Sequence, residues 1–141
     1  MFQLPIENDE ELLKKYGLAS ALLASTDYLL GEMVRLNGGL FKANQDLVNA
    51  LLDKKTFGFK VGLAKHLIED KELIEKFKKA VEDRNILAHG VSVEQNGEFK
   101  LMSSNAFHDL NTQTLDEIIA RTRELSGSIY AEIKKNFNIA Q

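Results

Sequence analysis

Residues 114–137 read TLDEIIARTRELSGSIYAEIKKNF, and this stretch decides the fold class of the chain. Its apolar side chains return every three or four positions, which is the spacing of one face of an α-helix. They are Leu115, Ile118, Ile119, Leu125, Ile129, Ile133 and Phe137. Thr114 and Glu117 form a capping box, so we expect the helix to begin there. One apolar face on so long a helix requires other elements to pack against it.

A first long helix is expected near the N-terminus. Asn8 and Glu11 form another capping box, and Gly38 and Gly39 supply the open backbone that ends a helix. Its apolar face consists of Leu12, Tyr16, Ala19, Leu23, Leu30 and Met33. Small residues on the same stretch would let another helix approach closely, and they are Gly17, Ala19, Ser20, Ala21, Ala24 and Ser25.

Three shorter helical segments follow. Residues 40–54 predict a second helix, and Thr56 is the expected N-cap of a short third helix that contains Phe59, Leu63 and Leu67. Asp70 is the expected N-cap of a fourth helix, and Gly90 ends it. The inner face of the fourth helix is expected to comprise Leu73, Phe77, Ala80 or Val81, and Leu87.

The hydrophobic pattern changes from helical to alternating in residues 91–102, which predicts a β-hairpin around Asn96-Gly97. A two-residue loop would pair Val93 with Lys100. A three-residue loop, with Gly97 left-handed, would pair Val93 with Phe99 and thus match apolar faces, so we favour the second register.

These elements predict an all-α protein, an antiparallel four- to five-helix bundle with one small β-hairpin inserted before the last helix. The length of 141 residues fits a single domain, residues 1–141. The chain has no cysteine, so disulfides, thiolate metal sites and a cysteine nucleophile are excluded. The N-terminus is acidic and no apolar run reaches the ~20 residues of a membrane span, so we expect a cytoplasmic protein without a membrane partner.

The formal net charge is −3, which does not favour nucleic acid for the chain as a whole. Residues 54–90 differ, because nine basic and six acidic side chains give them a net charge of +3. Two interpretations stay open for these lysines. They belong to solvated helix faces, or they guide a nucleic-acid strand.

Residues 82–90, EDRNILAHG, carry the functional hypothesis. Arg84 and His89 lie five residues apart near the end of the fourth helix, about 140° apart around its axis, whereas Asn85 and His89 share a face. His66 and His108 show no metal-ligand spacing with any other histidine or with a carboxylate cluster. We expect His66 at the surface or at its boundary with the core, His108 in a loop, and neither a metal nor a cofactor.

The segment RNILAH, from Arg84 to His89, resembles the R-x4–6-H motif of the HEPN superfamily, named for nucleotide-binding proteins of higher eukaryotes and prokaryotes. Asn85 matches the polar residue common after the arginine. The resemblance implies a helical bundle, and many members are metal-independent endoribonucleases that act as toxins or in antiviral defence. Some toxins carry a tyrosine two residues after the histidine, where a partner nucleotidyltransferase modifies them. Val91 stands there in this chain, so that mode of neutralisation is not expected.

The resemblance assigns His89 as general base toward an RNA 2′-OH, Arg84 as the phosphate clamp, and Asn85 as the residue that orients either His89 or the phosphate. One chain supplies one motif histidine, so a homodimer around the fourth helix would complete the site. The expected partners are an RNA substrate, a second copy, and an antitoxin or regulatory protein. The alternative is a non-enzymatic helical bundle that binds a protein partner or a nucleotide.

Overall fold

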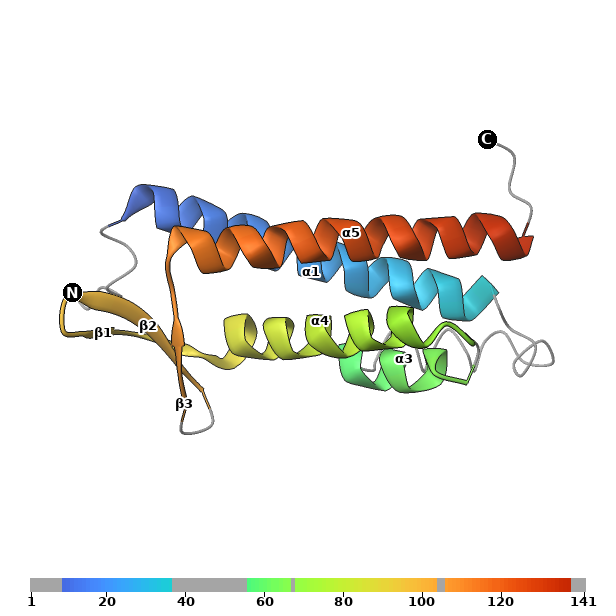
Figure 1. Cartoon of the computed structure of the whole chain (residues 1–141), viewed down its shortest axis with the longest axis horizontal. Coiled ribbons are helices and arrows are strands. Elements are labelled where there is room, and N and C mark those ends of the chain that lie inside the picture. The colour runs from blue at the N-terminus through green and yellow to red at the C-terminus, as the bar shows by residue number, and fades with distance from the viewer. Residues whose placement is uncertain (1–8, 37–55, 67, 104–105, 138–141) are drawn as a thin grey trace.

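The computed structural model describes residues 9–36, 56–66, 68–103 and 106–137. Three long helices run along the molecule: α1 (Glu10–Leu36), α4 (Lys71–His89) and α5 (Thr112–Phe137) (Figure 1). The short helix α3 (Phe57–Ala64) packs against α1 and α4. The predicted mostly-α bundle is therefore confirmed, with four helices in the described residues. The helix expected over residues 40–54 and the ends expected at Gly38 and Gly39 lie outside those residues.

Two of the three long helices run in the same direction, and the third runs in the opposite direction. Lys15 of α1 pairs with Asp116 of α5 at 2.8 Å, and Thr26 lies 2.7 Å from Ser126 between their hydroxyl oxygens, so α1 and α5 run parallel to each other. Helix α4 runs antiparallel to both, since its later residues contact earlier residues of α5 (Figure 1). The core lies among these three helices and α3. Its largest side chains with almost no exposed surface include Leu12, Leu23, Phe57, Phe77, Leu115 and Ile129.

Capping side chains set the helix ends, and two of the expected caps are displaced. Thr56 and Asp70 cap α3 and α4 as predicted. Helix α1 is capped by Asp9, whose Oδ1 accepts from the backbone N–H of Leu12 at 3.0 Å, whereas the expected cap Asn8 lies outside the described residues. Asn and Asp are both good N-cap residues, so two of them in adjacent positions cannot be distinguished by their spacing alone.

The last helix begins three residues earlier than the Thr114–Glu117 capping box predicts. Asn111 is its cap, with Oδ1 accepting from the N–H of Thr114 at 2.8 Å. Thr114 Oγ1 in turn accepts from the N–H of Asn111 at 3.1 Å. Thr114 therefore closes the capping box instead of opening it. The predicted apolar face of α5 is buried as expected through Ile133.

The apolar residues that the sequence analysis named in α3 are not the ones that the helix buries most deeply. The helix buries Phe57, Val61 and Ala64, whereas Phe59 is 38% exposed and Leu63 is half-buried. Leu67 lies outside the described residues. The named residues and the buried residues both recur at helical spacing in this short segment. The packing of α3 against α1 and α4 decides which of the two sets is buried.

A three-stranded antiparallel sheet lies at the end of the bundle where α4 ends and α5 begins (Figure 1). It consists of β1 (Val91–Gln95), β2 (Glu98–Ser103) and β3 (Ala106–Asp109), in that spatial order. The hairpin is confirmed, but the third strand was not predicted. His108 consequently lies in β3, opposite Leu101, and not in a loop.

The favoured hairpin register is wrong, because the loop has two residues. Val93 pairs with Lys100, and both Asn96 (φ 52°) and Gly97 (φ 81°) are left-handed. That backbone is the type I′ turn, whose twist matches antiparallel strands and for which Asn-Gly is the preferred sequence. Turn geometry therefore outweighed the matching of apolar faces. Leu101 is buried against the bundle, while Met102 and Phe107 remain 41% and 52% exposed.

Candidate functional site

The end of α4 carries all three residues of the motif, and a glycine fixes how the chain leaves it. Gly90 adopts extended backbone, and its N–H donates to the carbonyl oxygen of Ile86 at 2.8 Å. A Cβ at this position would lie 2.4 Å from that oxygen and 3.2 Å from the Cβ of Leu101. The path of the chain past the Ile86 carbonyl therefore requires glycine directly after His89, and the nearness of Leu101 in β2 adds to this requirement.

Arg84 faces α1 and lines a small hollow of about 180 Å³ between the two helices. The side chain is half-buried, and it has no hydrogen bond or ion pair with any other residue that the structure describes. Asp27 lines the same hollow, but Lys60 already pairs with it at 2.7 Å. The guanidinium group thus has donors to offer an incoming anion. The hollow is lined by Ser20, Leu23, Ala24, Asp27, Arg84, Leu87 and Ala88.

Asn85 and His89 lie on a different side of α4 and are exposed. Neither side chain lines the Arg84 hollow. Four residues separate them, so they share a helix face, whereas Arg84 is about 140° around the axis from His89 and about 7.5 Å away along it. A single chain therefore presents the Arg84 guanidinium and the His89 imidazole on neighbouring surfaces and not in one pocket.

Tyr16 fixes the last turn of α4 to α1, a role that the sequence analysis missed. Its hydroxyl donates to the carbonyl oxygen of Leu87, one of the carbonyl groups at a helix end that lack a partner within the helix. Burial raises the pKa of Tyr16, so the phenol stays protonated and remains a donor. The signal available in the sequence was a polar-tipped aromatic residue on an otherwise apolar stripe.

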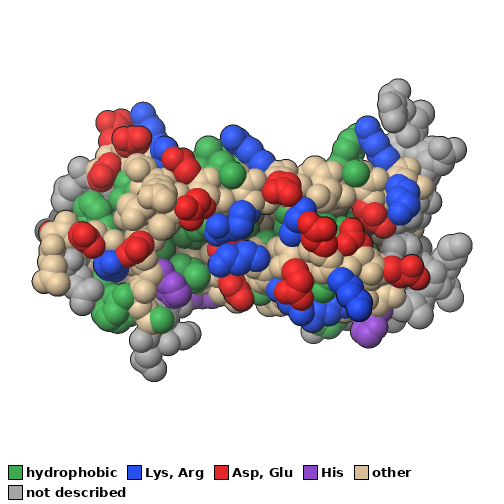
Figure 2. Space-filling view, viewed as in Figure 1, with side chains coloured by type: hydrophobic (Ala, Val, Ile, Leu, Met, Phe, Trp, Pro, Cys, Tyr) green, Lys and Arg blue, Asp and Glu red, His purple; other side chains and the backbone are tan. Residues whose placement is uncertain are grey.

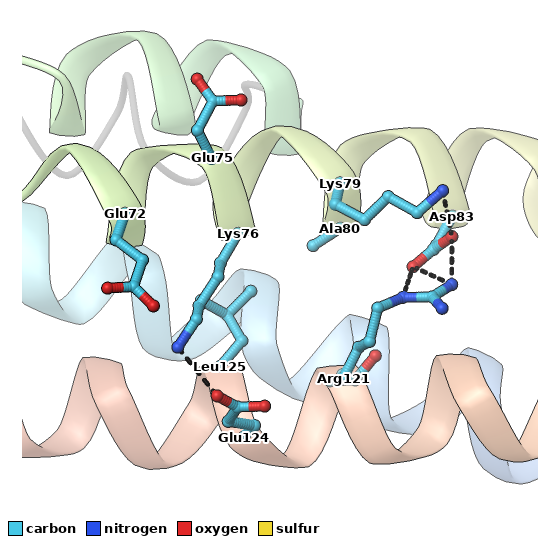
Figure 3. A pocket seen from close by; sticks show the side chains of 10 residues that line it. Glu72, Glu75, Lys76, Lys79, Ala80, Asp83, Arg121, Glu124 and Leu125 are labelled. Atoms are coloured by element: carbon cyan, nitrogen blue, oxygen red, sulfur yellow. Dashed lines mark hydrogen bonds and ion pairs between the residues drawn. The ribbon is translucent and has the colours of Figure 1, made fainter.

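Asp83 of α4 is buried in the contact between α4 and α5. Arg121 Nη2 lies 3.0 Å from its Oδ1 and 3.1 Å from its Oδ2, and Arg121 Nε lies 3.3 Å from Oδ2 (Figure 3). The side chain of Asp83 is 4% exposed. Because each helical residue turns the direction by 100°, fixing Asp83 toward α5 turns Arg84 toward α1. The ion pair sits directly before the motif and orients it.

The basic residues of segment 54–90 divide between ion pairs and solvent. Lys76 pairs with Glu124 at 2.8 Å, Lys78 with Glu75 at 3.0 Å, and Lys60 with Asp27. The hydrogen bond between Lys76 and Glu124 raises the pKa of Lys76 and lowers the pKa of Glu124. Lysines that pair with nearby carboxylates attract the phosphates of a nucleic-acid strand only weakly, because the carboxylates offset their charge. Lys54 and Lys55 lie outside the described residues.

His66 is exposed, as expected, and His108 is half-buried in β3. Within residues 9–36, 56–66, 68–103 and 106–137, no group of three or more side chains is arranged to hold a metal ion. Over the same residues, no helix is long and apolar enough to span a bilayer.

Comparisons with protein-family models, with curated proteins and with solved structures found no match to this chain. The motif, the bundle and the geometry of α4 therefore carry the functional argument.

Proposed function

We propose that the chain is a HEPN-like, metal-independent endoribonuclease in which Arg84 and His89 act on the scissile phosphodiester. The observation that carries the proposal is the half-buried Arg84, which has no hydrogen bond or ion pair with any described residue and faces a hollow whose carboxylate, Asp27, already pairs with Lys60. Partial burial removes water from some of the guanidinium N–H donors, and a bound anion would supply acceptors in its place. RNA phosphate is the anion that the motif implies.

Arg84 and His89 would supply two of the groups that the reaction needs, a phosphate clamp and a general base. His89 would accept the proton of the 2′-OH, and the 2′-oxygen would then attack the adjacent phosphorus atom. Arg84 would bind the non-bridging oxygens and stabilise the added charge in the pentavalent transition state. The bond from phosphorus to the 5′-oxygen breaks, and that oxygen takes a proton from a general acid. The products are a 2′,3′-cyclic phosphate and a 5′-OH, and Asn85 would orient His89 or the phosphate.

A homodimer supplies the missing general acid. A two-fold axis near α4 would bring a second His89 to the site, and one imidazolium can donate while the other imidazole accepts. The surface of α1 beside the hollow supports this arrangement, because its exposed residues are uncharged and mostly small: Leu13, Gly17, Ala21, Ala24 and Tyr28. Small exposed side chains allow close approach of a second helix, which the sequence analysis expected of this stretch.

Two further parts of the proposal come from the resemblance. The protein would act in the cytoplasm as a toxin or a component of antiviral defence. An antitoxin or another regulatory protein would then control it.

The test is RNA cleavage by the purified chain in the presence of EDTA, with the product ends identified. We expect 2′,3′-cyclic phosphate ends, and His89→Ala and Arg84→Ala should each lower the rate by about 10²–10⁴-fold. Two exposed residues elsewhere provide matched controls, His66→Ala and Arg123→Ala, and these should cleave like the wild type.

Melting temperatures separate loss of chemistry from loss of fold. Arg84 is half-buried and has no ion pair within the described residues, so Arg84→Ala should leave the protein folded. Absence of cleavage by the wild type, or wild-type cleavage by folded His89→Ala, would refute the proposal. Either result would favour the non-enzymatic bundle that binds a protein partner or a nucleotide.

A further inference from the structure

The contact between α4 and α5 leaves three hollows in a row on the face of the molecule shown in Figure 2. We call this row the α4–α5 seam. Their volumes are about 250, 340 and 370 Å³ from the start of α4 to its end. Neighbouring hollows share lining residues, Glu72 and Lys76 between the first two and Lys79 and Arg121 between the last two. The seam is therefore continuous along α4.

Two ion pairs cross the seam and set the spacing of the hollows. Lys76 bonds Glu124 across it, and Asp83 bonds Arg121 (Figure 3). Ala80 lies between the two pairs and leaves the middle hollow open. Lys76 and Asp83 are seven residues apart on α4, a rise of about 10.5 Å. Leu73, Ala80 and Leu87 of α4 line the three hollows in turn, so successive hollows are about one heptad apart along the helix.

Each hollow has buried apolar side chains in its lining, the middle hollow is mainly apolar, and polar surface exceeds apolar surface in the first and third. Leu73 lies in the first, Ala80 and Leu125 in the second, and Leu101 and Ile118 in the third. Exposed apolar surface is present at both ends, from Ala131 in the first hollow and Phe107 in the third. A helix laid along the seam could place one apolar side chain in each hollow.

The rims carry a strong negative charge. The residues that line the three hollows include eight carboxylates and three basic side chains, a formal net charge of −5, whereas the whole chain has −3. This charge disfavours RNA, whose phosphates would be repelled. It also disfavours a second copy paired through the same face, because a two-fold axis would set two acidic surfaces against each other.

We infer that the α4–α5 seam binds a basic amphipathic helix of a partner protein, with apolar residues at positions i, i+7 and i+14 and lysine or arginine beside them. The apolar residues enter the three hollows, and the basic residues pair with rim carboxylates such as Glu72 and Glu117. About 16 residues of helix match the length from Asp70 to Ile86. The seam and the Arg84 hollow share only Leu87 among their lining residues, and Arg84 itself does not line the seam, so the inference does not depend on ribonuclease activity.

The test uses a fluorescent synthetic peptide of three heptads, with one leucine in each heptad, lysines beside the leucines and alanine elsewhere. The matched peptide has the same composition, but its leucines are five residues apart and so lie on different faces of the helix. Fluorescence anisotropy with the full chain should show the heptad peptide binding about tenfold more tightly or better, and binding should weaken with salt.

Variants of the seam locate the binding. Ala131→Trp should fill the first hollow from an exposed position and weaken binding about tenfold, whereas Ala120→Trp, also exposed on α5 but outside the seam, should not. Glu117→Lys should weaken binding, and Glu82→Lys, exposed on α4 outside the seam, should have little effect. Circular dichroism confirms that each variant is folded.

Several results would overturn the inference. No binding of the heptad peptide would do so, as would equal binding of the two peptides or wild-type affinity in folded Ala131→Trp. If Ala131→Trp instead turned a dimer into a monomer in sedimentation velocity, the seam would be an interface between copies of this chain. If Ala131→Trp weakened the binding of a labelled single-stranded RNA, the occupant would be RNA.

Discussion

Removing the two partners of the Asp83–Arg121 ion pair should cost unequal amounts of stability. Arg121→Ala would leave a carboxylate that is 4% exposed, with Lys79 Nζ at 4.0 Å as its remaining cation. Breaking a buried pair in this way typically costs about 3–5 kcal/mol of unfolding free energy. Because Lys79 still offsets part of the carboxylate charge, we expect a loss of about 3 kcal/mol. Asp83→Ala leaves a guanidinium that is already 40% exposed and can turn toward water, so we expect about 1 kcal/mol.

Urea unfolding followed by circular dichroism at neutral pH would measure both losses. The double variant should resemble Asp83→Ala, because the buried carboxylate is then absent, and the double-mutant cycle should give a coupling of about 2–3 kcal/mol. The exposed Arg123→Ala serves as control and should change the free energy of unfolding by less than about 0.5 kcal/mol. Equal losses for the two single variants, or a loss below about 1 kcal/mol for Arg121→Ala, would refute the reasoning.

Three further predictions test contacts around the motif and the helix ends. Tyr16→Phe should lower the free energy of unfolding by about 1 kcal/mol. Burial raises the pKa of Tyr16 in the folded state. Its stabilising contribution is therefore present below the unfolded pKa of about 10 and is lost as the pH rises through the folded value. Between about pH 9 and 12, the urea midpoint should consequently fall less in Tyr16→Phe than in the wild type. Gly90→Ala should destabilise by about 1–3 kcal/mol because its Cβ meets Ile86, whereas Gly17→Ala, in open space on a helix, should stabilise by about 0.5–1 kcal/mol; thermal melts giving both the same sign would contradict the geometry. Asn111→Ala should cost about 1 kcal/mol through loss of the α5 cap, and an unchanged urea midpoint would show that the cap is dispensable.

The sequence by itself determined the fold class and most of the core. Apolar residues at helical spacing identified the buried faces of α1, α4 and α5, because a helix of four or more turns repeats its pattern often enough to leave one solution. Asp70 and Gly90 marked the ends of α4, since an N-cap acceptor and a residue without a side chain are local requirements. The motif from Arg84 to His89 was visible for the same reason, as its position at a helix end follows from neighbouring residues.

Tertiary structure decided everything that depended on which surface meets which. Asp83 resembles any other carboxylate on a charged helix, and Arg121 on α5 makes it a buried partner. Tyr16 became the anchor of the last α4 turn because α1 passes beside Leu87. The stripe that α3 buries was likewise selected by packing. Sequence spacing specifies the directions of side chains around one helix axis. Which of these directions faces a neighbouring helix is fixed only when several helices pack in one core. The sequence therefore showed the motif residues but not the hollow that Arg84 faces.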